Sequence, residues 1–205
     1  MRKWLWAIGV AGIVVLAGVV AVVYPLVSGG DGRTGAWAFP PPKAVYAFGY
    51  VSDEGWRIED RVVSLEGEEV LTLPETAFVA AAVTGADGRL YFSDYGRKAV
   101  YCLARDGTLA WEAKGERGFV IPSDAFPIAF NPDRTELWVA NTGMKELQRL
   151  DTATGRFVAV WKPVAPFPGC CNPIRFTVLE GDVFVCYVKP DVGTPILYGP
   201  DGKKL

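Results

Sequence analysis

Short apolar segments separated by turns recur three times along the second half of the chain. Similar five-residue segments begin at Leu90, Leu137 and Val183, at spacings of 47 and 46 residues. Each is followed by a second apolar segment and then by a glycine turn, and these glycines are 48 and 47 residues apart. Short apolar segments bounded by turns predict β-strands, so the pattern predicts a series of similar small sheets.

A repeat of this length, made of short strands and glycine turns, is typical of the four-stranded blade of a β-propeller. We expect three blades, with strands at 78–83, 89–94, 99–103 and 109–113, then 127–130, 136–140, 146–150 and 157–161, then 174–179, 182–188 and 195–198. Residues 44–73 predict a partial blade, with a strand at 44–48 and a hairpin at 61–65 and 70–73. The fold class is therefore all-β and propeller-like over residues 44–205, with about three to four blades.

This number of blades is small, because propellers usually have about four to eight. The ring is then either small and closed by residues 61–73, or completed by a second propeller chain or another protein, or the sequence is a fragment of a longer propeller. An open sheet edge favours pairing with another chain.

The chain begins with a predicted membrane helix. Residues 1–3 include two cations, and residues 4–27 form an apolar run without a charge. This is long enough for a hydrocarbon core of about 30 Å. A cleaved signal peptide is the alternative, but bulky residues stand where a peptidase prefers small ones. The positive-inside rule predicts a single-pass inner-membrane protein with a cytoplasmic N-terminus and a periplasmic or extracellular domain.

Small residues four apart in this run, which can let membrane helices pack closely, are Ala7, Ala11, Ala17 and Ala21. Residues 28–43 predict a glycine- and proline-rich linker. Trp37 and Phe39 within it either pack on the domain or contact a partner.

The composition excludes several classes of function. Without the two N-terminal cations the chain has a net charge of −4 and no basic patch, which argues against nucleic acid. The chain has no histidine, which removes catalytic triads, histidine-ligated metals and a simple pH switch near neutrality. We therefore expect no enzyme activity, no cofactor, no metal site and no catalytic residue.

Four cysteines are the other candidates for chemistry. Cys170 and Cys171 are adjacent and precede Asn172-Pro173. They predict a structural loop or a vicinal disulfide, with a redox or ligand role as the alternative. Cys102 and Cys186 fall in predicted strands and are expected to be buried free thiols.

Two sets of residues share repeat positions. Asp94 and Asn141 are expected to cap the turn after the second strand of a blade. Core packing is expected for Tyr91, Trp138 and Phe184. Loops at 114–122 and 161–172 carry Phe119 and Phe167, which we take as candidate partner contacts.

The repeats resemble NHL-type repeats in the segment from Tyr91 to Gly96 and in the Asp-Gly turns. The segment Gly169-Cys170-Cys171-Asn172-Pro173 is similar to the Cys-Cys-Asn-Pro blade of exported bacterial NHL-repeat proteins of unassigned biochemistry. The resemblance covers residues 76–205 and implies an exported propeller. The chain departs from it in having fewer blades and Tyr187 at the Asp94 position. Related propeller lyases use histidine and metal residues that this chain lacks.

These features together predict a membrane-anchored, non-catalytic scaffold or docking module. Its partners would be the lipid bilayer and other membrane-protein subunits, for which it would be an accessory subunit. A small-ligand or redox propeller using the Cys170-Cys171 loop is the alternative.

Overall fold

A computed structural model of the protein describes residues 50–122, 125–164, 174–188 and 195–205. The predicted membrane helix, the linker and the strand at 44–48 lie outside these residues. So do the cysteine pair, Asn172 and Pro173, and the aromatic residues Trp37, Phe39 and Phe167. No helix in the part that the structure describes is long and apolar enough to cross a bilayer.

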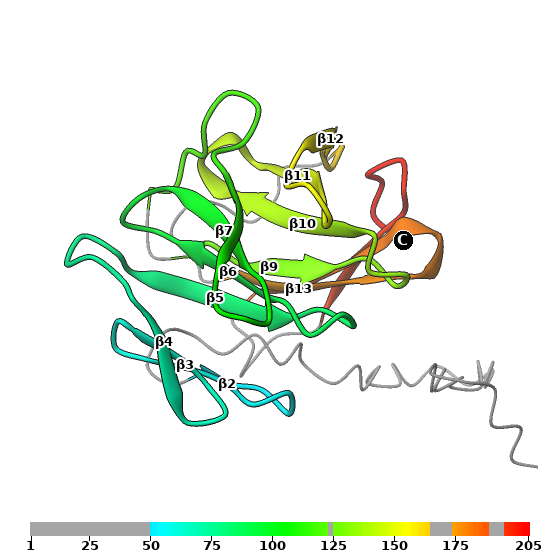
Figure 1. Cartoon of the computed structure of the whole chain (residues 1–205). Coiled ribbons are helices and arrows are strands. Elements are labelled where there is room, and N and C mark those ends of the chain that lie inside the picture. The colour runs from blue at the N-terminus through cyan, green and yellow to red at the C-terminus, as the bar shows by residue number, and fades with distance from the viewer. Residues whose placement is uncertain (1–49, 123–124, 165–173, 189–194) are drawn as a thin grey trace, which may run out of the picture. The chain divides into compact units, whose positions relative to one another are not determined.

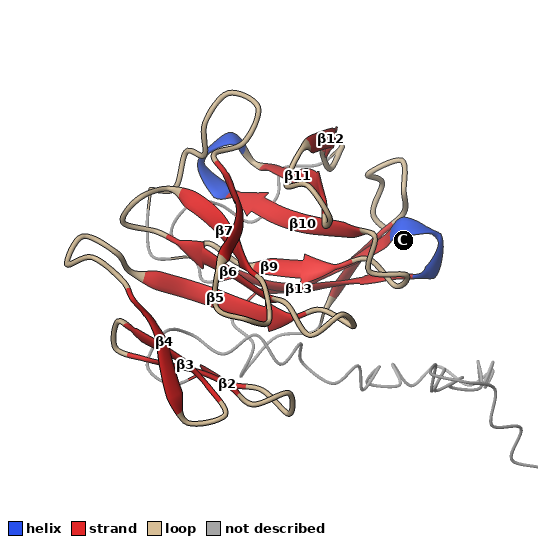
Figure 2. Ribbon diagram, viewed as in Figure 1, coloured by secondary structure: helices blue, strands red, loops and turns tan. Residues whose placement is uncertain are grey.

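The described chain forms four antiparallel sheets, which we number 1 to 4 in chain order (Figures 1 and 2). Sheet 1 consists of β1 (Tyr50–Val51), β2 (Trp56–Glu59), β3 (Val62–Leu65) and β4 (Glu68–Thr72). Sheet 2 consists of β5 (Val79–Thr84), β6 (Leu90–Asp94), β7 (Ala99–Leu103) and β8 (Leu109–Ala113). Sheet 3 consists of β9 (Ile128–Phe130), β10 (Glu136–Asn141), β11 (Glu146–Asp151) and β12 (Phe157–Trp161), with the 3-10 turn η1 (Thr142–Met144) between β10 and β11. Sheet 4 has three described strands, β13 (Ile174–Leu179), β14 (Val183–Val188) and β15 (Ile196–Tyr198), with η2 (Glu180–Asp182) between the first two. Within each sheet, every strand pairs with the next one in the chain, which is the connectivity of a propeller blade.

Consecutive sheets pack face to face. Side chains alternate along each strand, so sheets 2 and 3 present one apolar row to the sheet before and another to the sheet after. The three buried clusters include Trp56 and Phe92 (sheets 1 and 2), Tyr91 and Val139 (sheets 2 and 3), and Trp138 and Phe184 (sheets 3 and 4). The first strands of the four sheets are also neighbours. Strand β9 contacts both β5 and β13, and the hydroxyls of Tyr50 in β1 and Thr84 in β5 are 2.7 Å apart. The sheets are therefore stacked as successive blades.

Turn glycines fix these contacts between sheets. Gly107, Gly155 and Gly202 follow the third strand of sheets 2, 3 and 4 and all have positive φ, which favours glycine. A Cβ atom at Gly107 would lie 2.6 Å from Val70 of β4, and one at Gly155 would lie 2.6 Å from the ring of Trp111. At Gly202 it would meet the chain directly after β12. Each turn thus lies against the end of the preceding sheet, too closely for a larger residue.

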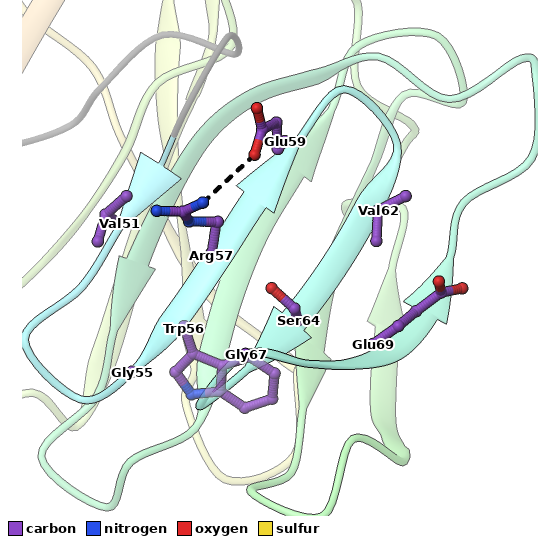
Figure 3. A pocket seen from close by; sticks show the side chains of 9 residues that line it. All are labelled: Val51, Gly55, Trp56, Arg57, Glu59, Val62, Ser64, Gly67 and Glu69. Carbon is purple, nitrogen blue, oxygen red and sulfur yellow. Dashed lines mark hydrogen bonds and ion pairs between the residues drawn. The ribbon is translucent and has the colours of Figure 1, made fainter.

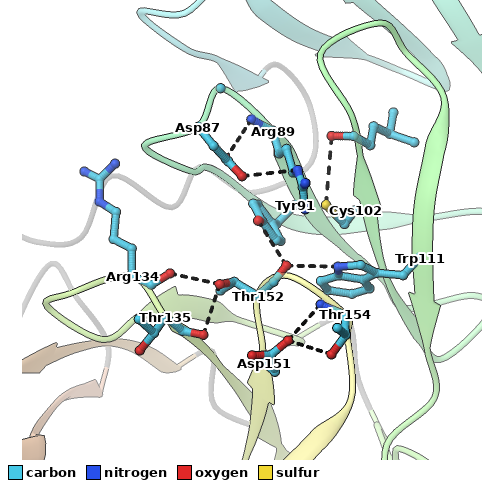
Figure 4. Close-up of polar contacts among 12 residues, drawn as sticks. Asp87, Arg89, Tyr91, Cys102, Trp111, Arg134, Thr135, Asp151, Thr152 and Thr154 are labelled. Atoms are coloured by element: carbon cyan, nitrogen blue, oxygen red, sulfur yellow. Dashed lines mark hydrogen bonds and ion pairs between the residues drawn. The ribbon is translucent and has the colours of Figure 1, made fainter.

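Two tryptophans each donate a hydrogen bond to the turn that contacts them from the next sheet. Trp111 Nε1 donates to the carbonyl oxygen of Thr152 at 3.0 Å, and the Tyr91 hydroxyl donates to the same oxygen at 3.3 Å (Figure 4). Trp161 Nε1 donates to the carbonyl oxygen of Pro200 at 3.1 Å. The contact between sheets 2 and 3 is therefore repeated between sheets 3 and 4.

Two sequence interpretations need correction. Residues 50–72 form a sheet of four strands, where the sequence predicted a partial blade. In addition, Phe184 is not equivalent to Tyr91 and Trp138. Those two side chains face the following sheet, whereas Phe184 faces the preceding one. One residue of offset reverses the face of a strand, so Val185 is the equivalent residue, and Tyr187 is not the counterpart of Asp94.

Candidate docking surface

The outer face of sheet 1 is exposed, and a hollow lies on it. Along β2, Trp56 and Ile58 point toward sheet 2 and are buried, while Arg57 and Glu59 point outward and are exposed. The alternation of large apolar and charged residues explains this arrangement, because one face is covered and the other meets water.

Strand pairing arranges the outward side chains in two rows. Val51, Arg57, Ser64 and Glu69 are successive cross-strand neighbours from β1 to β4. Glu59, Val62 and Thr72 form the next row. Residues paired in this way have Cβ atoms about 5 Å apart and act as one surface. The face therefore combines two exposed valines with charged groups of both signs.

A hollow of about 680 Å³ lies on this face (Figure 3). Its lining is Val51, Gly55, Trp56, Arg57, Glu59, Val62, Ser64, Gly67 and Glu69. Arg57 Nη1 and Glu59 Oε2 are 3.5 Å apart, and these side chains are 58% and 70% exposed. An ion pair this exposed contributes little to stability, so both charges remain available to a partner.

No described strand covers the turn at one end of the hollow. Gly67 lies between β3 and β4, with a φ of 91°. A Cβ atom at Gly67 would have no described atom within 4 Å, in contrast to the turn glycines of sheets 2, 3 and 4. Ser64 provides a small side chain in the middle of the first row. This part of the face is thus formed by backbone and one hydroxyl group.

Phe119 is not part of an exposed contact surface. Its side chain is 4% exposed and its ring centroid lies 5.0 Å from that of Phe126, within the cluster between sheets 2 and 3. The proposed partner contact at Phe119 is therefore wrong. The apolar ring of this loop is needed in the core, and the adjacent Val120, 46% exposed, faces outward instead.

The polar repeat residues have structural roles. Asp94 Oδ1 accepts hydrogen bonds from the backbone N–H groups of Phe78, at 2.9 Å, and Arg97, at 3.1 Å, which confirms the expected turn cap. The same expectation is wrong for Asn141, which makes no capping hydrogen bond to the turn Thr142–Met144. Its Oδ1 accepts from the N–H of Val120 at 2.7 Å, so it holds the loop between sheets 2 and 3 instead.

A buried carboxylate supports the same loop. Glu146 is 6% exposed, and its Oε1 accepts hydrogen bonds from the amides of Asn141 and Gln148, while Lys162 Nζ lies 3.0 Å from Oε2. Burial alone would raise the pKa of Glu146, but the hydrogen bonds and the charge of Lys162 lower it below its usual value. Sequence reasoning missed this network, because it forms only when β10, β11 and β12 pair and bring Asn141 and Lys162 to Glu146.

Cys102 and Cys186 are free and buried, as expected. Burial raises the pKa of Cys102 to about 11 and that of Cys186 to about 12. Such thiols are almost fully protonated and unreactive in the folded protein. Among the described residues, no group of three histidine, cysteine or acidic side chains is placed to hold a metal ion.

A second hollow of about 450 Å³ lies where the first strands of the sheets meet. Residues from β1, β5, β9 and β13, with the turns after β1 and β9, line it. Its charged residues are Asp53, Glu54 and Arg134. Sequence reasoning placed no residue here, because the turn after β1 belongs to the unrecognised first half of sheet 1.

No protein-family model and no curated protein matches the chain. Solved structures match it in fold. A streptogramin B lyase superposes with a TM-score of 0.53 at 13% identity, over 82% of this chain and 55% of that chain. The virginiamycin B lyase of Staphylococcus aureus, in a catalytically inactive form with quinupristin, gives 0.53 at 17% identity, over 84% and 56%. U3-55K gives 0.51 at 15% identity, over 79% and 50%. The chain spans about half the length of these proteins, and the similarity shows a propeller-type fold alone.

Proposed function

We propose that this protein is a non-catalytic docking module, anchored in a membrane, which serves as an accessory subunit of a larger membrane protein complex. The outer face of sheet 1 carries the proposal. Sheets 2 and 3 have both faces covered by neighbouring sheets, whereas this face of sheet 1 is exposed and hollowed.

The composition of the face favours reversible docking. Permanent interfaces are more apolar, whereas interfaces between proteins that also exist apart resemble the ordinary surface. Here two exposed valines, Val51 at 63% and Val62 at 37%, stand among Arg57, Glu59 and Glu69. Burying these charges against an apolar sheet would be costly, so the partner has to supply charges that pair with them.

A non-catalytic role is supported by the residues that the sequence lacks. The virginiamycin B lyase structure is of a form inactivated by replacing one histidine with alanine. This chain has no histidine, although it has a similar fold. The resemblance to exported NHL-repeat proteins and the apolar run at residues 4–27 support the membrane location and the export of residues 44–205.

The proposal can be tested by extracting the full-length protein from its native membrane in mild detergent and measuring the intact mass of the assembly. We expect other membrane subunits in fixed stoichiometry. The Arg57→Glu variant reverses a charge in the centre of the outer face of sheet 1, which is the proposed docking face, and should lose these subunits. The matched control is Arg117→Glu, because Arg117 is also exposed and lies 3.7 Å from its neighbour Glu116. Recovery of the wild-type protein alone, or equal loss in both variants, would argue against the proposal.

A small-ligand function is the second candidate, and the hollow bounded by the first strands favours it. Its acidic residues Asp53 and Glu54 lie on one turn and Arg134 on another, so a small molecule with both charges would fit. Protection of the full-length protein against heat by a library of such molecules would support this function, provided that Arg134→Ala removes the effect.

A further inference from the structure

The contacts between the described sheets indicate what kind of neighbour the outer face of sheet 1 can accept. At each described junction, the turn after the third strand of one sheet contacts the sheet before it. The contact is with the last strand of that sheet or with the residues that directly follow that strand. Trp111 lies on Gly155 in this way, and Trp161 bonds to the turn that contains Gly202. In sheet 1 the corresponding turn glycine is Gly67, and no described atom covers it.

The groups around Gly67 are suited to an aromatic ring. The small residues Ser64 and Gly67 line the bottom of the hollow. Arg57 and Glu69 are the cross-strand neighbours of Ser64 on either side (Figure 3). Arginine side chains lie over aromatic rings elsewhere in this chain, as Arg149 does over Trp138 at 5.0 Å from the ring centroid. Arg57 can pack on a ring in the same way, and the Glu69 carboxylate can accept a hydrogen bond from an indole N–H.

We propose that the docking partner inserts a tryptophan side chain from the outer strand of a β-sheet into this hollow, over Ser64 and Gly67 and between Arg57 and Glu69. The inference rests on the proposed docking function and specifies its partner. The indole would take the position toward sheet 1 that Trp111 takes toward sheet 3. Tryptophan and arginine are also the side chains that most often dominate binding energy at interfaces.

A peptide copied from this chain provides the probe. The segment from Thr108 to Lys114 contains Trp111 in a strand that packs on a turn glycine. Synthesised with 5-fluorotryptophan, the peptide gives a fluorine NMR signal that the protein itself does not contribute. We expect this signal to shift on addition of the full-length protein in detergent. Unlabelled peptide should reverse the shift, whereas a peptide with alanine in place of tryptophan should not.

Two variants block the hollow in different ways. Ser64→Leu fills the floor with a side chain, and Gly67→Asn adds one to the open turn. Each should weaken peptide binding at least about tenfold, which corresponds to about 1.4 kcal/mol. The matched control is Gly181→Asn, because Gly181 also has positive φ and no described atom within 4 Å of its Cβ position. It should bind like the wild type.

An unchanged response in the Ser64→Leu and Gly67→Asn proteins, or no response at millimolar peptide, would overturn the inference. The two proposals fail separately. If subunits still co-purify in an Arg57-dependent manner but the peptide does not bind, the face docks a partner without an inserted tryptophan. If no subunit co-purifies, the docking function itself fails.

Discussion

The close contact between Gly155 and Trp111 predicts that Gly155→Ala destabilises the stack of sheets. Gly155 has a φ of 70°, and the added Cβ would lie 2.6 Å from the indole ring. The left-handed conformation costs a non-glycine residue about 1–2 kcal/mol. Forcing extra volume into a packed contact costs about 1–3 kcal/mol more.

Gly181 separates these two costs. Its φ is 72°, and a Cβ there would have no described atom within 4 Å. Gly181→Ala should therefore carry the conformational cost alone. The steric part is the difference between the two variants, about 1–3 kcal/mol.

The assay is unfolding of the full-length protein in non-ionic detergent, by urea and by heat, followed by tryptophan fluorescence. For a domain of this size, 1 kcal/mol shifts the melting temperature by roughly 2–4 °C. Gly155→Ala should thus melt several degrees below Gly181→Ala. Equal melting temperatures for the two variants would refute the claim that turn glycines hold neighbouring sheets in close contact.

Three further outcomes follow from the described side chains. Trp161→Phe should lower the free energy of unfolding by about 1 kcal/mol in a urea titration, because it removes one hydrogen bond between sheets 3 and 4 and keeps an aromatic ring. The pKa of Glu146 is lowered in the folded state, so its charge stabilises the protein above the unfolded value of 4.5 and this contribution is lost as the pH falls below it. Glu146→Gln should therefore be less stable than wild type at pH 7, with the difference shrinking in urea titrations towards pH 3. Because burial raises the pKa of Cys102 to about 11 and that of Cys186 to about 12, neither should react with iodoacetamide at pH 8 until the protein unfolds, which peptide mass mapping can follow.

The strands of sheets 2 to 4 could be predicted from the sequence because similar apolar segments and glycine turns recur at spacings of 46 to 48 residues. The predicted bounds of 99–103, 109–113, 157–161 and 174–179 are those of β7, β8, β12 and β13. Sheet 1 was only half recognised. β1 has two residues and β2 has four, so both are too short to be recognised on their own, although β2 alternates between buried and exposed positions.

The docking face could not be predicted for a different reason. The sequence shows that Arg57 and Glu59 alternate with Trp56 and Ile58, which predicts one polar face. It does not show that no described sheet covers this face, because that depends on the order in which the blades stack. The error at Phe184 has another cause, because a spacing of 46 instead of 47 residues shifts the strand by one position and so reverses the face of the side chain.

Site-specific photo-cross-linking in the native membrane tests the docking function most directly. A photoreactive amino acid replaces Val62, which is 37% exposed in the second row of the docking face. The matched position is Val158 on β12, which is 49% exposed and lies outside this face. The account predicts that Val62 cross-links in high yield to one membrane-protein subunit and that Val158 does not. Cross-linking of both positions to the same mixture of proteins, or of neither to any protein, would contradict it.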